Sequence, residues 1–237
     1  MKKLKQALPS ILLLVTAIVS LAALMRQGDV ERIPYDVHEV PLEAEADDSS
    51  DIEDDEIDWT SLPDSVVAWA RVPGTTVDYP VMQGSADDPN FYLRHNMHGV
   101  WSSWGTPYID PGCSDGMESP LVIVYGHHMS DGTMFAPLAQ YSSRSFAEEH
   151  RAIYVFTREK TYVLQVFAAD VVNASAEGKR TAFEDAEDLQ DYIVEKLDGC
   201  AVVLERLENL QQAWAFVTCS YQTSNSRIVV YAKEVES

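Results

Sequence analysis

The chain has 237 residues, 46% of them hydrophobic, which is enough for one sizeable folded domain and additional segments. Its formal net charge is −21 at pH 7. Such an acidic chain repels phosphate backbones and anionic headgroups, which argues against a nucleic-acid-binding protein and against electrostatic adhesion to a membrane.

The N-terminus has the pattern of a segment that enters a membrane. Lys2, Lys3 and Lys5 precede the run 8–25, which carries no charged residue. A basic flank before about 18 mostly apolar residues indicates a cleaved signal peptide or a retained transmembrane anchor. The run is longer than a usual signal-peptide core, so we expect a single-pass anchor at 1–28. The lysines should stay in the cytoplasm and the rest of the chain should lie outside the cell.

An acidic segment separates this run from the remainder of the chain. Between Glu43 and Asp58 there are ten acidic residues and no basic ones. Such a segment repels itself and buries little apolar surface. We therefore predict an extended tether over 29–57 and a folded domain over 58–237.

The folded part is predicted to be mainly β. Its short runs of apolar, β-branched and aromatic residues are bounded by turn-forming residues. Strands at this density favour a closed or nearly closed barrel. The predicted strands are 77–82, 121–125, 152–157, 161–168, 201–204, 213–219 and 228–233.

Two helices are predicted to interrupt the strands. One spans 65–70. The other begins near Thr181, where Thr181 and Glu184 have the spacing of a capping box, and ends at Gly199. The apolar face of the second helix comprises Leu189, Tyr192, Ile193 and Leu197.

The stretch 101–120 fits either a loop near a functional site or an ordinary surface excursion. We prefer the surface excursion.

The strongest chemical signal lies near the C-terminus. Cys219 follows the apolar run 213–218, and Arg227 opens the next run, 227–232. The polar residues between the runs predict an antiparallel hairpin, which would bring Cys219 close to Arg227. Because a nearby cation favours the thiolate, this is the pattern of a nucleophile beside a fixed cation.

A cysteine nucleophile usually needs a histidine to transfer protons. His127 lies just past the predicted strand 121–125, where a rigid scaffold can present a catalytic group. His128 follows, and because neighbours on an extended chain point to opposite sides, only one of the two should face the cysteine. Taken singly, Cys219, His127 and Arg227 fit a buried thiol, a structural histidine and a solvated arginine, but their combination favours catalysis.

The motifs together resemble those of class B sortases. The resemblance extends over about 58–235, and several motifs in the same order make it specific. The segments that carry it are 67–84, 91–93, 125–127, 129–135, Thr218-Cys219 and Arg227 with the strand it opens.

The resemblance implies a cysteine transpeptidase on the outer face of a Gram-positive cell. Cys219 would attack a C-terminal sorting signal of a surface protein, Asn-Pro-x-Thr-like or Leu-Pro-x-Thr-like, and form a thioacyl-enzyme. An amine of a cell-wall precursor or of a pilin would then release the product. His127 would be the general acid and base, and Arg227 would stabilise the oxyanion or the substrate.

The resemblance also implies an architecture. A closed β-barrel would carry an N-terminal helix and a long helix inserted late in the barrel, and the long helix would wall the substrate groove. Leu93, Tyr125 and Thr218 would contact the substrate. No metal or cofactor is implied.

The chain departs from the family pattern at several positions. Ala215 and Phe216 replace a Thr and a Leu, Ser220 follows the cysteine where an Asp is often close, and His128 stands where Asn is usual. Asp88-Pro89 replaces an Asp-Asn pair. These changes bear on substrate choice more than on the chemistry.

Other functions remain open at this point. A thiol hydrolase would use the same residues with water as acceptor, and a membrane-tethered β module would bind a partner without chemistry. An L,D-transpeptidase would carry His and Cys in one short motif, whereas His127 and Cys219 are 92 residues apart. Cys113 and Cys200 could form a disulfide or remain two thiols.

Overall fold

The structure of the protein, a computed structural model, describes residues 57–173, 179–220 and 225–235. The predicted anchor at 1–28 lies outside the described residues, as does the tether at 29–57 apart from its last residue. Among the described residues there is no helix with the length and apolarity needed to span a bilayer.

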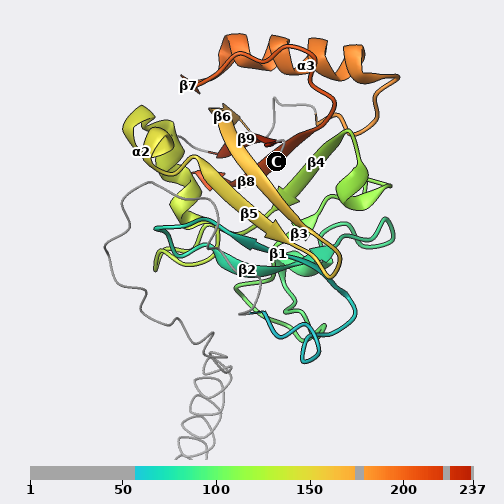
Figure 1. Cartoon of the computed structure of the whole chain (residues 1–237). Helices are drawn as coiled ribbons and strands as arrows, with labels where there is room; N and C mark the ends of the chain where they lie inside the picture. Colours follow the sequence, from blue (N-terminus) through green and yellow to red (C-terminus); the bar gives the residue numbers. More distant parts are fainter. Residues whose placement is uncertain (1–56, 174–178, 221–224, 236–237) are drawn as a thin grey trace, which may run out of the picture. The chain divides into compact units, whose positions relative to one another are not determined.

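The strands of the described residues close into a barrel (Figure 1). Neighbours follow the order β5-β1-β2-β3-β4-β8-β9-β6, and β6 pairs with β5 to complete the ring. β7 is added beside β6. The closed barrel predicted from the sequence is therefore confirmed. The strands are β1 Val66–Arg71, β2 Asp78–Gln83, β3 Tyr108–Ile109, β4 Leu121–Tyr125, β5 Ala152–Phe156, β6 Thr161–Asn173, β7 Val202–Val203, β8 Ala213–Ser220 and β9 Ser226–Glu234.

The predicted helix at 65–70 is wrong, because this segment is strand β1. Val66, Ala68 and Ala70 are buried, and the residues between them are half-buried. A burial period of two is that of a strand. β1 pairs with both β2 and β5, and these pairings override the helix propensity of its alanines.

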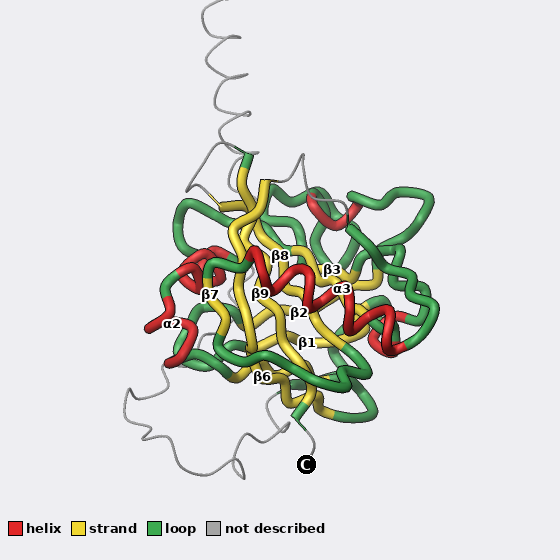
Figure 2. The backbone as a smooth tube through the Cα atoms, turned by 90° about the horizontal axis from the view of Figure 1, so that it is seen from above, coloured by secondary structure: helices red, strands yellow, loops and turns green. Residues whose placement is uncertain are grey.

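Helix α3, Ala186–Gly199, is the long helix expected late in the barrel. It begins five residues after Thr181, because Asp185 is the N-cap and its side chain accepts a hydrogen bond from the backbone N of Asp188. It ends at Gly199 as predicted. Figure 2 shows α3 crossing over the strands of the barrel. Its buried side chains are Leu189, Ile193 and Leu197.

The remaining helices are single turns or short segments. Among the described residues, three of them are 3₁₀ helices and one is an α-helix. η4 and α2 lie between β4 and β5 in the chain, and η2 lies between β2 and β3. Their bounds are η2 Phe91–Leu93, η3 Gly116–Glu118, η4 Ala136–Ser142 and α2 Arg144–Glu149.

The stretch 101–120 is a surface excursion only in part, because Trp101 at its start is 54% exposed, whereas its middle belongs to the barrel. It contains β3, and Asp110 and Cys113 within it are 1% and 0% exposed. The Cys113 thiol donates to the carbonyl of Leu121 at 3.3 Å, and burial raises its pKa to about 11. Cys113 and Cys200 are not joined by a disulfide. Cys113 is therefore a packed thiol that stays protonated at physiological pH.

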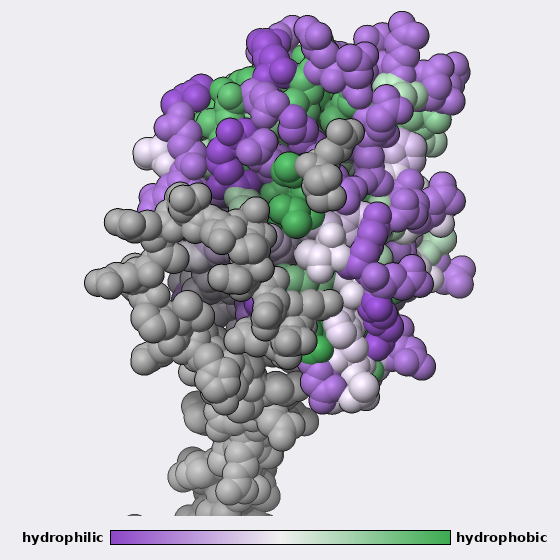
Figure 3. Space-filling view, in the orientation of Figure 1, coloured by the Kyte–Doolittle hydropathy of each residue, from purple (hydrophilic) through white to green (hydrophobic). Residues whose placement is uncertain are grey.

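Aromatic side chains fill one face of β8. Trp214 and Phe216 stack with ring centroids 6.2 Å apart, Tyr162 of β6 meets Trp214 edge-on, and Phe135 meets Phe216. All four are at most 3% exposed. Figure 3 shows that the described surface in that view is mostly hydrophilic, with small apolar areas. These four aromatic side chains are thus in the core, and Ala215 and Val217 lie on the other face of β8.

Gly126 joins β4 to the residues that follow it, and a larger side chain does not fit there. A Cβ on Gly126 would lie 2.5 Å from two ring atoms of Phe135, which is fully buried. We expect Gly126→Ala to lower the free energy of unfolding by about 1–3 kcal/mol through overpacking. Urea unfolding followed by tryptophan fluorescence measures this. Gly199→Ala is the matched control, because its Cβ would meet nothing within 4 Å; an equal loss in both variants would contradict the packing argument.

Candidate active site

Three strands bring the predicted catalytic residues to one end of the barrel. β8 lies between β4 and β9. It runs parallel to β4, with Tyr125 opposite Val217, and antiparallel to β9, with Cys219 opposite Arg227. The antiparallel pairing predicted for Cys219 and Arg227 is therefore confirmed. Because β4 ends level with Val217, the chain reaches His127 at the end of β8 that carries Cys219.

His127 is held by its ring and by its backbone. Its Nε2 lies 2.7 Å from the carbonyl O of Leu93, and its own carbonyl accepts a hydrogen bond from the N of Phe135 at 2.8 Å. The next residue, His128, forms an isolated β-bridge with Met134. The two histidines thus have different surroundings, and His127 is the one tied to the 3₁₀ turn η2.

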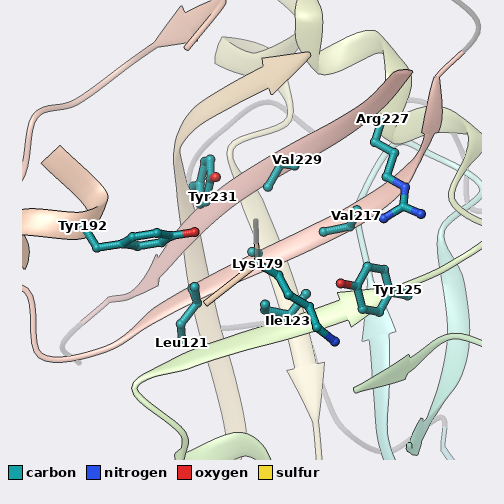
Figure 4. Close-up of a pocket in the computed structure, with 10 residues that line it drawn as sticks. Leu121, Ile123, Tyr125, Lys179, Tyr192, Val217, Arg227, Val229 and Tyr231 are labelled. Atoms are coloured by element: carbon teal, nitrogen blue, oxygen red, sulfur yellow. The ribbon is translucent and has the colours of Figure 1, made fainter. Parts of the chain in front are cut away.

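A pocket lies on the face of β4, β8 and β9 opposite the aromatic cluster. Alternate residues of the three strands line it, as the period of a strand requires. Figure 4 shows Arg227 and Tyr125 at one end and Tyr192 of α3 at the other. Most of the lining is apolar. The lining residues are Leu121, Ile123, Tyr125, Lys179, Tyr192, Ala215, Val217, Arg227, Val229 and Tyr231.

The three residues expected to contact substrate are in different places. Tyr125 lines the pocket. Thr218 is 2% exposed on the opposite face of β8, and among the described residues its hydroxyl has no hydrogen-bond partner. Leu93 is not part of the lining; its carbonyl accepts the hydrogen bond from His127. Of the three side chains, the structure brings only that of Tyr125 to the pocket.

A buried carboxylate beside the pocket was missed in the sequence. Asp110 has a side chain that is 1% exposed, and its Oδ2 lies 2.5 Å from Nζ of Lys179. The backbone N of Gly112 donates to its Oδ1 at 2.7 Å. The pair joins β3 to the segment that leads into α3. An acid directly after the apolar pair Tyr108-Ile109 is a weak signal, and nothing in the sequence marks Lys179 as its partner 69 positions away.

The phenols beside the pocket stay neutral at physiological pH. Burial, and then the charge of Asp110, raise the pKa of Tyr125 well above its ordinary value, while Arg227 acts in the opposite direction. Burial raises the pKa of Tyr108 to about 12, again against Arg227. The guanidinium of Arg227 is therefore the cation at this end of the pocket, since the charge of Lys179 is paired with Asp110.

Within the described ranges, no three His, Cys, Asp or Glu side chains group as metal ligands.

Comparisons with known proteins agree with this geometry. The family model for the sortase domain matches residues 70–235. Sortase B of Staphylococcus aureus is 31% identical over 169 residues, which are 68% of this chain and 66% of that protein, so the chain spans just under two thirds of its length.

Solved structures show the same fold. Clostridium perfringens sortase B has a TM-score of 0.66 and 28% identity, and the match covers 73% of this chain and 94% of that one. The Staphylococcus aureus sortase B–substrate complex has a TM-score of 0.64 and 29% identity, and the match covers 73% and 80%.

Proposed function

Because the chain belongs to the sortase family, we propose that it is a class B sortase, a cysteine transpeptidase that attaches surface proteins to an amine. The observation that carries the proposal is the register of β4, β8 and β9. It sets Cys219 opposite Arg227 and brings His127 to the same end of the barrel. A nucleophile, a proton carrier and a cation at one site are the groups that acyl transfer requires.

In the first half of the proposed reaction, the Cys219 thiolate attacks the carbonyl carbon of the scissile peptide bond in a sorting signal. The oxygen gains negative charge in the tetrahedral intermediate, and Arg227 stabilises it. When the carbon–nitrogen bond breaks, His127 gives a proton to the leaving amine. A thioacyl-enzyme remains.

In the second half, a free amine replaces the amine that left. The acceptor amine loses a proton to His127 and attacks the thioester carbonyl. The carbon–sulfur bond then breaks, the Cys219 thiolate is restored, and a new amide bond joins the two partners. Arg227 stabilises the second oxyanion as it did the first.

The pocket is suited to an extended, largely uncharged peptide. Apolar side chains from three strands line its floor, and Tyr192 of α3 stands at one end. This supports α3 as a wall of the substrate groove and Tyr125 as a contact beside the reacting bond. We assign Leu93 and Thr218 supporting roles near the site, since Thr218 is buried and Leu93 acts through its carbonyl.

We also propose the cellular setting. The run 8–25, with its basic flank, supports a single-pass membrane anchor with the catalytic domain outside the cell. The partners would be surface proteins with an Asn-Pro-x-Thr-like or Leu-Pro-x-Thr-like signal, and a cell-wall precursor or pilin that supplies the amine.

A peptide assay tests the proposal. The full-length chain in detergent is incubated with fluorogenic peptides of both signal types, with and without triglycine, and products are identified by mass spectrometry. We expect cleavage after the Thr and an amide adduct with triglycine. Free acid as the sole product in the presence of triglycine would indicate a thiol hydrolase. The absence of cleavage by the folded chain would favour a binding module.

A further inference from the structure

The hydrogen bond between His127 and Leu93 has a chemical consequence for proton transfer. We propose that the Leu93 carbonyl fixes the His127 ring in one tautomer, with the proton on Nε2, and that Gly105 is a positioning residue that leaves space for this carbonyl. The inference rests on the proposed function only in taking His127 as the proton carrier. The tautomer itself can be measured independently of any activity.

The tautomer follows from the identity of the partner. Nε2 lies 2.7 Å from the carbonyl O of Leu93, and a carbonyl oxygen can only accept. Nε2 must therefore be the donor, and in the neutral ring Nδ1 is then the nitrogen without a proton. Nδ1 becomes the atom that takes up and gives back the proton. Because Nε2 keeps its hydrogen in both charge states, the ring need not turn during the reaction.

The Leu93 carbonyl is held by its surroundings and cannot follow a displaced ring freely. The N of Leu93 donates to the carbonyl of Asn90 at 3.0 Å. The preceding carbonyl, of Tyr92, accepts from the N of Thr106 at 2.8 Å. The Leu93 side chain packs against the cluster around Met82. The turn η2 is thus tied both to the loop that returns to β3 and to the barrel.

Gly105 lies directly against this carbonyl. A Cβ there would be 2.4 Å from O of Tyr92, 2.8 Å from O of Leu93 and 2.9 Å from the carbonyl carbon of Leu93. All three are backbone atoms, and both oxygens already accept hydrogen bonds. A methyl group at 105 must displace them, which moves the acceptor away from the His127 ring.

The chain contains a matched control in the same loop. Gly105 and Gly99 both have positive φ, +62° and +72°, so an alanine meets similar backbone strain at either position. At Gly99, however, a Cβ would meet only one ring atom of Phe91, at the ordinary distance of 3.9 Å. The two alanine variants therefore differ mainly in whether the new Cβ displaces the Leu93 carbonyl.

The experiment compares the full-length chain with Gly105→Ala and Gly99→Ala. We expect Gly105→Ala to lower kcat about 10- to 100-fold with KM within about twofold, since general acid–base catalysis contributes roughly 10²–10⁴-fold. Gly99→Ala should stay within about threefold of the parent protein. Equal effects of the two substitutions on kcat, whether large or small, would overturn the role of Gly105.

A spectroscopic measurement separates this inference from the proposed function. In chain labelled with ¹⁵N-histidine, at a pH where the ring is neutral, the His127 signals should show a protonated Nε2 and an unprotonated Nδ1. His127→Gln assigns the signals. Gly99→Ala should keep this pattern and Gly105→Ala should show a mixture of tautomers. If the parent protein shows the proton on Nδ1, the inference fails even if Gly105→Ala does not fold and even if the peptide assay succeeds.

Discussion

Replacing Cys219 with alanine is expected to abolish the amine-dependent cleavage of sorting-signal peptides. The thioacyl intermediate needs the sulfur, and loss of a covalent nucleophile lowers kcat by about 10⁴-fold or more. No mass adduct of the acyl portion should be trapped on the variant when the acceptor amine is left out. The fold should persist, because residue 219 takes part in β8 through backbone pairing with Arg227, which alanine can also make.

Cys200→Ala is the control for this substitution. Cys200 is half-buried and caps the C-terminal end of α3, so it lies outside the strands that form the site. Its replacement should leave turnover close to that of the parent protein. Amine-dependent turnover by Cys219→Ala at even a hundredth of the parent rate would remove Cys219 from the role of nucleophile.

The parts of the site that the sequence could predict are local in the chain. The runs 213–218 and 227–232 are close together, so a hairpin follows from their composition and sets Cys219 opposite Arg227. The parallel pairing of β4 with β8 joins segments about 90 residues apart. The residue pattern of neither strand indicates which other strand it pairs with. His127 could be selected from its place just past a predicted strand, and the family resemblance supported it, but the pairing that brings it to the end of β8 could not be predicted.

The errors have physical causes. The alanines in β1 suit a helix, and partners from β2 and β5 decide the outcome. β3 has two residues, which is too short for any periodic signal. At α3 both Thr181 and Asp185 have an acidic residue three positions later. In the structure the N-cap is Asp185, which accepts a hydrogen bond from the backbone N of Asp188. The side chain of Asp188 also forms an ion pair with Arg180.

The ion pair between Asp110 and Lys179 beside the pocket also could not be predicted from local sequence patterns. Asp110 and Lys179 come from β3 and from the approach to α3, and they meet only because the barrel has closed. Proximity of this kind depends on the fold and is absent from local pattern. The ion pair that ties the approach to α3 to the barrel is therefore a structural finding, whereas the pairing of Cys219 with Arg227 could be predicted.

The second large effect is expected for Arg227→Ala, which should lower kcat/KM by about 10²–10³-fold, the usual cost of removing one oxyanion donor. The side chain is exposed and lines the pocket, so the free energy of unfolding should change by no more than about 0.5 kcal/mol. Arg227→Lys should recover part of the loss, because it restores the charge without the planar pair of donors.

The control for Arg227 is Arg206→Ala. Arg206 is also exposed, and it pairs with Asp198 at 3.2 Å on the surface, a contact worth little in stability or catalysis. Its loss should leave kcat/KM unchanged. The kinetics of Arg227→Ala and Arg227→Lys are compared with those of the parent on the same peptide and amine. A lysine variant as slow as the alanine variant would show that the geometry of the guanidinium, and not its charge alone, stabilises the oxyanion; near-normal turnover by Arg227→Ala would exclude the cation from the mechanism.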